Sequence, residues 1–323
     1  MFKNTGVFPS PSVATTGQSL VSHAWLNVLA SFIDAFDVRD LCVDRLGQFV
    51  PAGARHRPGT ILGSLAARLA GGGEHVSDLD ILRSGPGVFG GVASNATISR
   101  FFERTVANPD LFDYGFSTMS RQLRSRVWAA AGDRNPALHA TALDPLIIDL
   151  DATLVTSHSD KEQAVGTYKG GYGSAPFAAS IDYGCGFGTG EILAVVLRPG
   201  NAGANSADDH IAVFTQAVAQ LPDAFYDEEG KLIGEKILVR TDSAGASRKF
   251  LYYLASLGVQ FSVSYPVPVA KARMVGWISD KQYWEPALDQ AGEERTCTFV
   301  PNRSTPGPRR PCWILMGTGS RRS

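Results

Sequence analysis

Residues 146–157 read LIIDLDATLVTS, an apolar run that leads into two carboxylates one residue apart. The apolar and β-branched residues predict a strand, and Asp149 and Asp151 lie toward its end. Side chains two positions apart on a strand share one face and lie about 6.6 Å apart along it. The stretch therefore predicts a site in which two acidic side chains point the same way at the end of a strand.

The composition is that of a globular chain with room for two ordinary domains: 323 residues, 44% hydrophobic and 19% charged, with a formal net charge of -1. Any DNA-binding surface would therefore be local. The N-terminus has no apolar core of signal-peptide length, so we expect a cytoplasmic protein with no membrane segment. The cysteines lack the spacing of a zinc site or a disulfide framework, which predicts isolated thiols: Cys42, Cys185, Cys297 and Cys312.

The first 140 residues carry helical periodicity and predict an all-helical N-terminal domain. One helix is expected over residues 20–36, with an apolar face made of Val21, Trp25, Val28, Leu29, Phe32 and Phe36. Another is expected from Ser94 or Asn95 onward, with Arg100 and Arg104 exposed and three side chains buried: Ile98, Phe101 and Phe102. Both a DNA-reading helix of a helix-turn-helix and an ordinary bundle helix have this pattern.

From residue 145 the periodicity changes to that of strands, and an α/β domain is predicted. Strands are expected at 145–155, 176–184, 190–200, 235–244 and 259–267, and helices at 205–222 and 246–257. The order along the chain is therefore three strands, a helix, a strand, a helix and a strand.

Two enzyme classes place acidic pairs at the end of such a strand. An RNase H-like core has three consecutive antiparallel strands and then helix-linked strands, and its metal carboxylates lie on the first and fourth strands. Asp151 or Asp149, together with Asp242, have these positions. A haloacid-dehalogenase-type phosphatase would instead use Asp149 as nucleophile and Asp151 as general acid, with strands and helices alternating directly afterwards. A Gly-rich polar loop and a strand pair follow, which favours the first class.

Four blocks extend this interpretation to a family: DLDATLV, GTYKGGYGSAPF, LRPGNAGANSADDHI and VRTDSAGASRKFLYYLASLGVQFSVSYPV. In order and spacing they resemble the core blocks of DDE-type transposases of bacterial insertion sequences, in the DDE group 1 branch. The likeness covers about residues 20 to 295. It implies a nucleoid-associated homo-oligomer that binds the terminal inverted repeats of double-stranded DNA. Metal-dependent strand cleavage and transfer with Mg²⁺ or Mn²⁺ is the implied reaction.

Residue by residue, the resemblance assigns catalytic and metal-binding roles to Asp151 and Asp242, with Asp149 as the less favoured ligand. Two carboxylates so close together repel each other unless a cation neutralises them. Two divalent ions bridged by such a carboxylate can activate a water or a 3'-hydroxyl and stabilise the leaving oxygen.

Residues expected to contact DNA lie in both halves of the chain. Arg100 and Arg104 are candidates on the predicted N-terminal helix, and Lys169 and Tyr168 in the Gly-rich loop are candidates for contact with the DNA backbone. A solvated loop lysine is an equally good interpretation of Lys169. His210 follows two acids at a predicted helix start, and either a role near the phosphate or plain packing is compatible with that position.

The chain departs from the family pattern after its second Asp. The family's third acidic residue is a Glu on a downstream helix, whereas residues 296–323 are rich in Pro and Arg and have no acid. Only Glu285, Glu293 and Glu294 remain as late substitutes. We therefore expect a helical DNA-binding and multimerisation domain at 1–140, an incomplete core at 141–295 and an irregular, frameshifted tail at 296–323. An impaired transposase is the resulting expectation, and a DNA-end-binding inhibitory remnant and the phosphatase are the alternatives.

Overall fold

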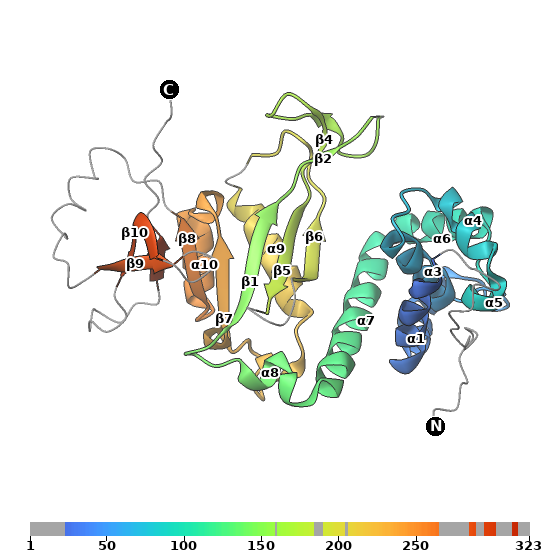
Figure 1. Ribbon diagram of the computed structural model, residues 1–323, viewed down its shortest axis with the longest axis horizontal. Helices are drawn as coiled ribbons and strands as arrows, with labels where there is room; N and C mark the ends of the chain where they lie inside the picture. Colours follow the sequence, from blue (N-terminus) through green and yellow to red (C-terminus); the bar gives the residue numbers. More distant parts are fainter. Residues whose placement is uncertain are drawn as a thin grey trace. The chain divides into compact units, whose positions relative to one another are not determined.

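The computed structural model describes residues 23–158, 160–183, 190–203 and 206–264, together with the backbone of three strands at 284–288, 294–301 and 312–315. The chain divides into two compact units, Met1–Gly132 and Asp133–Ser323, each of which is described by itself (Figure 1). The first unit is mostly helical and the second is a mixed α/β unit. Both observations agree with the expected fold class.

Seven α-helices are described in the first unit. They are α1 (Asn27–Ala35), α2 (Val38–Leu46), α3 (Pro58–Ala70), α4 (Asp80–Arg83), α5 (Pro86–Phe89), α6 (Asn95–Ala107) and α7 (Pro109–Ala130). Local signals start and stop them: Pro58 stands at the first position of α3, where its missing N–H is not needed, and Gly71 caps the end of that helix. Short 3-10 turns η1 (Ala24–Leu26), η2 (Gly47–Phe49) and η3 (Val76–Leu79) complete the unit.

The buried face of α1 differs from the one expected. Leu26, Ala30 and Ile33 are buried, whereas Trp25 is 59% and Val28 75% exposed. Apolar residues surround this helix on several sides, so periodicity alone could not choose between two faces. Contacts with α2 and α3 make the choice. The prediction was wrong for Trp25 and Val28, whereas Leu29 packs against the core of the unit as predicted. Val21 lies outside the described residues.

The helix α6 begins where expected, since the Ser94 hydroxyl accepts a hydrogen bond from the Thr97 backbone N–H at 3.3 Å. Ile98 and Phe101 are buried as predicted. Phe102 is 40% exposed, so its prediction as a core residue was wrong. The neighbouring helix α7 and the turns η2 and η3 contact α6, and the core cluster of the unit includes Ile98 and Phe101 but not Phe102.

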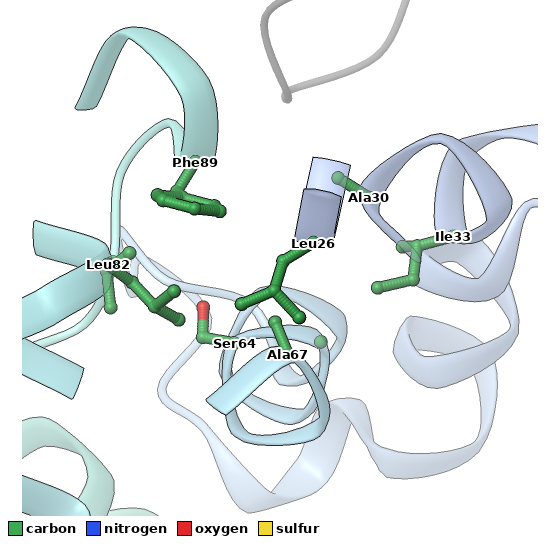
Figure 2. Close-up of a pocket in the computed structure, with 9 residues that line it drawn as sticks. Leu26, Ala30, Ile33, Ser64, Ala67, Leu82 and Phe89 are labelled. Atoms are coloured by element: carbon green, nitrogen blue, oxygen red, sulfur yellow. The ribbon is translucent and has the colours of Figure 1, made fainter. Parts of the chain in front are cut away.

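The core of the first unit is apolar and tightly packed around Leu46, Ile61, Ile98 and Phe101. Cys42 belongs to this core, where burial raises the pKa of its thiol to about 12. Figure 2 shows a small pocket in the same unit, and its lining side chains carry no charge: Leu26, Ala30, Ile33, Ser64, Ala67, Leu82, Phe89 and Val92, with Gly63. This pocket is a packing gap between helices and offers no group for chemistry.

A central sheet organises the second unit. Its strands are β1 (Leu146–Ala152), β5 (Phe177–Asp182), β6 (Glu191–Val196), β7 (Ile237–Thr241) and β8 (Gln260–Ser264), in the spatial order β8-β7-β1-β5-β6. Strands β1, β5 and β6 are antiparallel neighbours, while β7 and β8 run parallel to β1. The helices α9 (Ala207–Ala219) and α10 (Arg248–Ser256) connect the later strands, so the expected order of elements is confirmed.

One face of this sheet is covered by helices. Figure 1 shows α9 and α10 behind the strands, where α9 packs against β5 and β6 and α10 against β8. The alternation along β1 follows from this arrangement: Leu146, Ile148 and Leu150 are buried, whereas Asp149 is half-buried and Asp151 exposed. The two acidic side chains therefore lie on the face away from the helices.

Smaller elements extend from the sheet. A small second sheet, called here the β2–β4 sheet, has three strands in the order β2-β4-β3. They are β2 (Val155–Thr156), β3 (Val165–Gly166) and β4 (Tyr172–Ser174). The β2–β4 sheet lies beyond the carboxyl end of β1, the end near Asp149 and Asp151 (Figure 1). Later strands β9 (Trp284–Leu288) and β10 (Glu294–Pro301) pair antiparallel, and β11 (Cys312–Leu315) joins β8 in parallel. The helix α8 (Pro136–His139) precedes β1, and the 3-10 turns η4 (Gly132–Arg134), η5 (Asp223–Phe225), η6 (Gly234–Lys236) and η7 (Ser243–Gly245) lie between larger elements.

Candidate active site

Asp151 and Asp242 lie at the ends of neighbouring parallel strands. The register of β1 and β7 pairs Leu150 with Thr241. Asp151 follows Leu150 within β1, and Asp242 follows Thr241 directly after the end of β7. Parallel strands end at the same edge of a sheet, so the two side chains leave the backbone side by side. Both residues are exposed. The structure thus brings together the two acids that the sequence favoured.

Local hydrogen bonds orient both carboxylates. Asp242 caps the 3-10 turn η7, and its Oδ1 accepts the Ala244 backbone N–H at 2.8 Å. Asp151 Oδ1 accepts the N–H of the following residue, Ala152, also at 2.8 Å. Each carboxylate keeps further lone pairs for a cation or a solvent molecule, because an ionised carboxylate accepts about four hydrogen bonds.

Asp149 is in a different environment, because an arginine of the next strand binds it in a bidentate ion pair. Arg240 donates from Nε to Asp149 Oδ1 and from Nη2 to Asp149 Oδ2, both at 2.6 Å. The same Nη2 donates to Asp182 Oδ2 on β5 at 2.6 Å. These hydrogen bonds, that to Asp149 first, raise the pKa of Arg240 above its ordinary value. Asp149 therefore already has a cationic partner within the protein, which it shares with Asp182.

The acidic pair fits a divalent cation by its donor chemistry. Mg²⁺ prefers oxygen ligands and is commonly held by one or two carboxylates, with water and substrate phosphates completing its shell. Asp151 and Asp242 supply such oxygens. Within the residues that the structure describes, no group of three or more His, Cys, Asp or Glu side chains is arranged to hold a metal ion.

His210 lies on the covered side of the sheet, with 1% of its surface exposed. Its Nδ1 lies 2.7 Å from the Ser206 carbonyl oxygen, and its ring packs 4.6 Å from the Phe177 ring and 5.2 Å from the Phe250 ring, centre to centre. Burial lowers the pKa of His210, although the negative charge of Asp242 opposes the shift. The side chain is a packed, neutral imidazole, which matches the packing interpretation.

Arg198 links the end of β4 to the helix α9 on the covered face of the central sheet. Its guanidinium lies 4.7 Å from the centre of the Phe177 ring and donates to Asp209 of α9 at 3.0 Å. It also donates from Nε to the Ala175 carbonyl at 3.2 Å, directly after β4. With 5% of its surface exposed, Arg198 is a structural cation rather than a contact for DNA.

Tyr168 and Lys169 lie at the turn between β3 and β4, beyond the carboxyl end of β1. Tyr168 is 74% exposed, and the Lys169 ammonium lies 5.8 Å from the centre of its ring. Gly170 follows with a φ of 82°, a left-handed conformation that favours glycine. This turn presents an aromatic ring and a cation to solvent.

The arginines of α6 and α7 differ in their exposure and contacts. Arg100 and Arg104 are exposed one helical turn apart on α6. Arg124 of α7 is only 5% exposed, and Arg126 donates to the Phe36 carbonyl at 2.8 Å. Arg126 therefore links α7 to the end of α1 and Arg124 is buried, whereas the α6 pair is accessible.

Sequence reasoning missed Arg240, which binds Asp149, and Asp182, which is the second carboxylate bound by Arg240. Arg240 stands two residues before Asp242 and therefore on the same face of β7, a signal that the alternation VRTD contains. Asp182 carried no such signal, because its approach to Arg240 depends on the register of β5 against β1, where it pairs with Ile147.

Paired carboxylates at one edge of a mixed sheet are typical of metal-dependent enzymes that act on polynucleotides. The family model of the transposase DDE domain, group 1, matches residues 9–283, and the chain belongs to this family. A search of curated proteins found no match. The family acts on DNA in transposition and recombination and depends on a divalent metal, generally Mg²⁺. No helix in the described part of the chain is long and apolar enough to span a bilayer.

Proposed function

We propose that this chain is a transposase with an RNase H-like core that binds the terminal inverted repeats of its element as a homo-oligomer. The observation that carries the proposal is the adjacency of Asp151 and Asp242 at the ends of two parallel strands. It supports metal-dependent DNA strand cleavage and transfer at this edge of the sheet. The ion pair between Asp149 and Arg240 counts against a phosphatase, because a carboxylate bound in this way is a poor nucleophile.

The residues of this chain would act mainly by positioning. Asp151 and Asp242 would hold a divalent cation, Mg²⁺ or Mn²⁺, which when bound stabilises negative charge on the scissile phosphate and lowers the pKa of a bound water. The N-cap geometry of Asp242 fixes the direction of its carboxylate. The anchored β7 and β1 backbones fix the separation of the two carboxylates, and a preset separation reduces the reorganisation needed during reaction.

DNA contacts are proposed at two places. Lys169 and Tyr168 are exposed beyond the carboxyl end of β1, where a backbone phosphate and a sugar or base could reach them. Arg100 and Arg104 form an exposed basic pair on α6. Each phosphate contact should contribute roughly one unit to the slope of binding against salt concentration.

Catalysis by this chain is proposed to be impaired. Among the described side chains no third acid joins Asp151 and Asp242 in a metal-binding group. The side chains of the late residues Glu285, Glu293 and Glu294 are not among those that the structure describes. Two carboxylates can hold one ion, whereas positioning of a second ion ordinarily needs a further ligand. The same observation favours a second candidate function, a DNA-end-binding protein that inhibits intact copies by forming mixed multimers.

Sequencing the DNA on both sides of the gene supplies the element ends for a direct test. The purified full chain is incubated with labelled ends and Mg²⁺ or Mn²⁺, and both binding and nicking are measured. We expect salt-dependent binding with slow nicking, and Asp242→Asn should lower any nicking by at least about 100-fold. Asp80→Asn, a change of an exposed carboxylate in the first unit, is the matched control.

Each result separates the candidates. Efficient cleavage that Asp242→Asn abolishes would show that the enzyme is intact and that the proposed impairment is wrong. Binding without nicking favours the inhibitory protein. Absence of salt-dependent binding contradicts both, and hydrolysis of small phosphomonoesters that depends on Asp149 would restore the phosphatase.

A further inference from the structure

The cluster of Arg240, Asp149 and Asp182 stands directly beside the proposed catalytic pair. Arg240 and Asp149 are register partners on β7 and β1, and each lies two residues before one of the proposed metal ligands, Asp242 and Asp151. Because side chains two apart share a face, the ion pair and the catalytic pair form successive rows on the same open face. The guanidinium of Arg240 therefore lies two residues before the proposed metal ligands Asp151 and Asp242 along the strands.

The geometry of this cluster is that of a cross-strand tie. The guanidinium of Arg240 spans three neighbouring strands, since it binds Asp149 on β1 and Asp182 on β5 through contacts of 2.6 Å. All three side chains are partly exposed, at 43% for Arg240, 31% for Asp149 and 32% for Asp182. Solvent and ions thus have access, so Asp149 and Asp182 would attract a divalent cation if the arginine were absent.

We propose that Arg240 is a positioning residue: its guanidinium acts as a built-in counter-ion for Asp149 and Asp182 and so confines the divalent cation to Asp151 and Asp242. The inference rests on the proposed function of that pair. An arginine suits the task because its planar fork binds one carboxylate with two parallel hydrogen bonds and still reaches a second, whereas a lysine ammonium is a single point charge. Without the arginine, Asp149 and Asp182 would be a second carboxylate pair that competes with Asp151 and Asp242 for the cation.

Binding of Mn²⁺ to the full chain, followed by the loss of the free-ion signal in electron paramagnetic resonance, tests this without DNA and without cleavage. In the natural chain we expect binding that Asp242→Asn weakens by at least about tenfold. Arg240→Gln should gain an additional Mn²⁺ site, and the double variant Asp149→Asn, Arg240→Gln should lose it again. Arg240→Lys should show partial gain, because one ammonium replaces only part of the fork.

Several outcomes would overturn the inference. One is an unchanged number of Mn²⁺ sites in a folded Arg240→Gln protein, and another is the absence of Mn²⁺ binding from both this protein and the natural chain. If Arg240→Gln does not fold, Asp149→Asn alone decides: we expect Mn²⁺ affinity to change less than about threefold, and a loss as large as that of Asp242→Asn would make Asp149 a ligand. Failure of the proposed function is distinguishable, because DNA cleavage can be absent while the Mn²⁺ results hold.

Discussion

The two faces of strand β1 differ although they belong to the same seven residues. On one face Leu146, Ile148 and Leu150 are at most 6% exposed under the helices α9 and α10. On the other, Asp149 and Asp151 meet solvent and an arginine. The two faces therefore have different roles. Burial of apolar side chains on the helical face fixes the strands, and the fixed backbone positions charged side chains on the open face, because burying those charges would be costly.

The largest expected effect is a difference in unfolding free energy between changes on the two faces. Phe250→Ala removes a fully buried ring of α10 from the covered face and should cost about 4 kcal/mol. Val195→Ala on the open face, where that side chain is 52% exposed, should change stability by less than about 0.5 kcal/mol. Urea denaturation of both variants measures the contrast. Similar costs would mean that the open face is covered in solution.

A smaller contrast separates two arginine bridges. Arg198 is 5% exposed and holds Asp209 against the covered side, so Arg198→Met should cost about 2 kcal/mol. Arg240 is partly exposed on the open face, and solvent screening should limit the stability cost of Arg240→Met to about 1 kcal/mol or less. A double-mutant cycle with Asp209→Asn and Asp149→Asn isolates each pair. Equal coupling energies would contradict the difference in burial.

Much of the second unit was predictable because alternation along strands is a local property. The strands β1, β5 and β7 and the helices α9 and α10 lie where apolar spacing and capping residues such as Ser206 predicted them. Asp151 and Asp242 followed from the same pattern, since both stand where an apolar run ends. Their lateral adjacency required the order of strands in the sheet, which the comparison with an RNase H-like core supplied.

What could not be predicted depends on contacts between distant segments. The bidentate pairing of Arg240 with Asp149 follows from cross-strand register, and a shift of one residue would move each side chain to the other face. The buried side of η1 and α1 was mispredicted for a related reason: Trp25 and Leu26 of η1 are both apolar, and only the neighbouring helices decide which is covered. The strands of the β2–β4 sheet are two or three residues long, too short for periodicity to be visible.

The smallest expected effect is a pH dependence that belongs to the covered face. Burial lowers the pKa of His210 below its ordinary value of 6.5, against opposing influences of the Ser206 carbonyl, Asp209 and Asp242 and a reinforcing one of Arg198. Below pH 6.5 the unfolded chain therefore takes up a proton that the folded chain does not. The free energy of unfolding should fall as the pH drops through this window, and the loss should be complete below the lowered folded pKa.

His210→Gln is the variant that tests this, compared with His139→Gln, which changes an imidazole on the surface of the same unit. Melting temperatures between pH 7.5 and 5.5 avoid the range in which most carboxylates titrate. The natural chain and His139→Gln should lose stability over this range by similar amounts, and His210→Gln should lose less. If His210→Gln keeps the full slope, the acid sensitivity arises elsewhere, and the packed imidazole on the covered face is not its source.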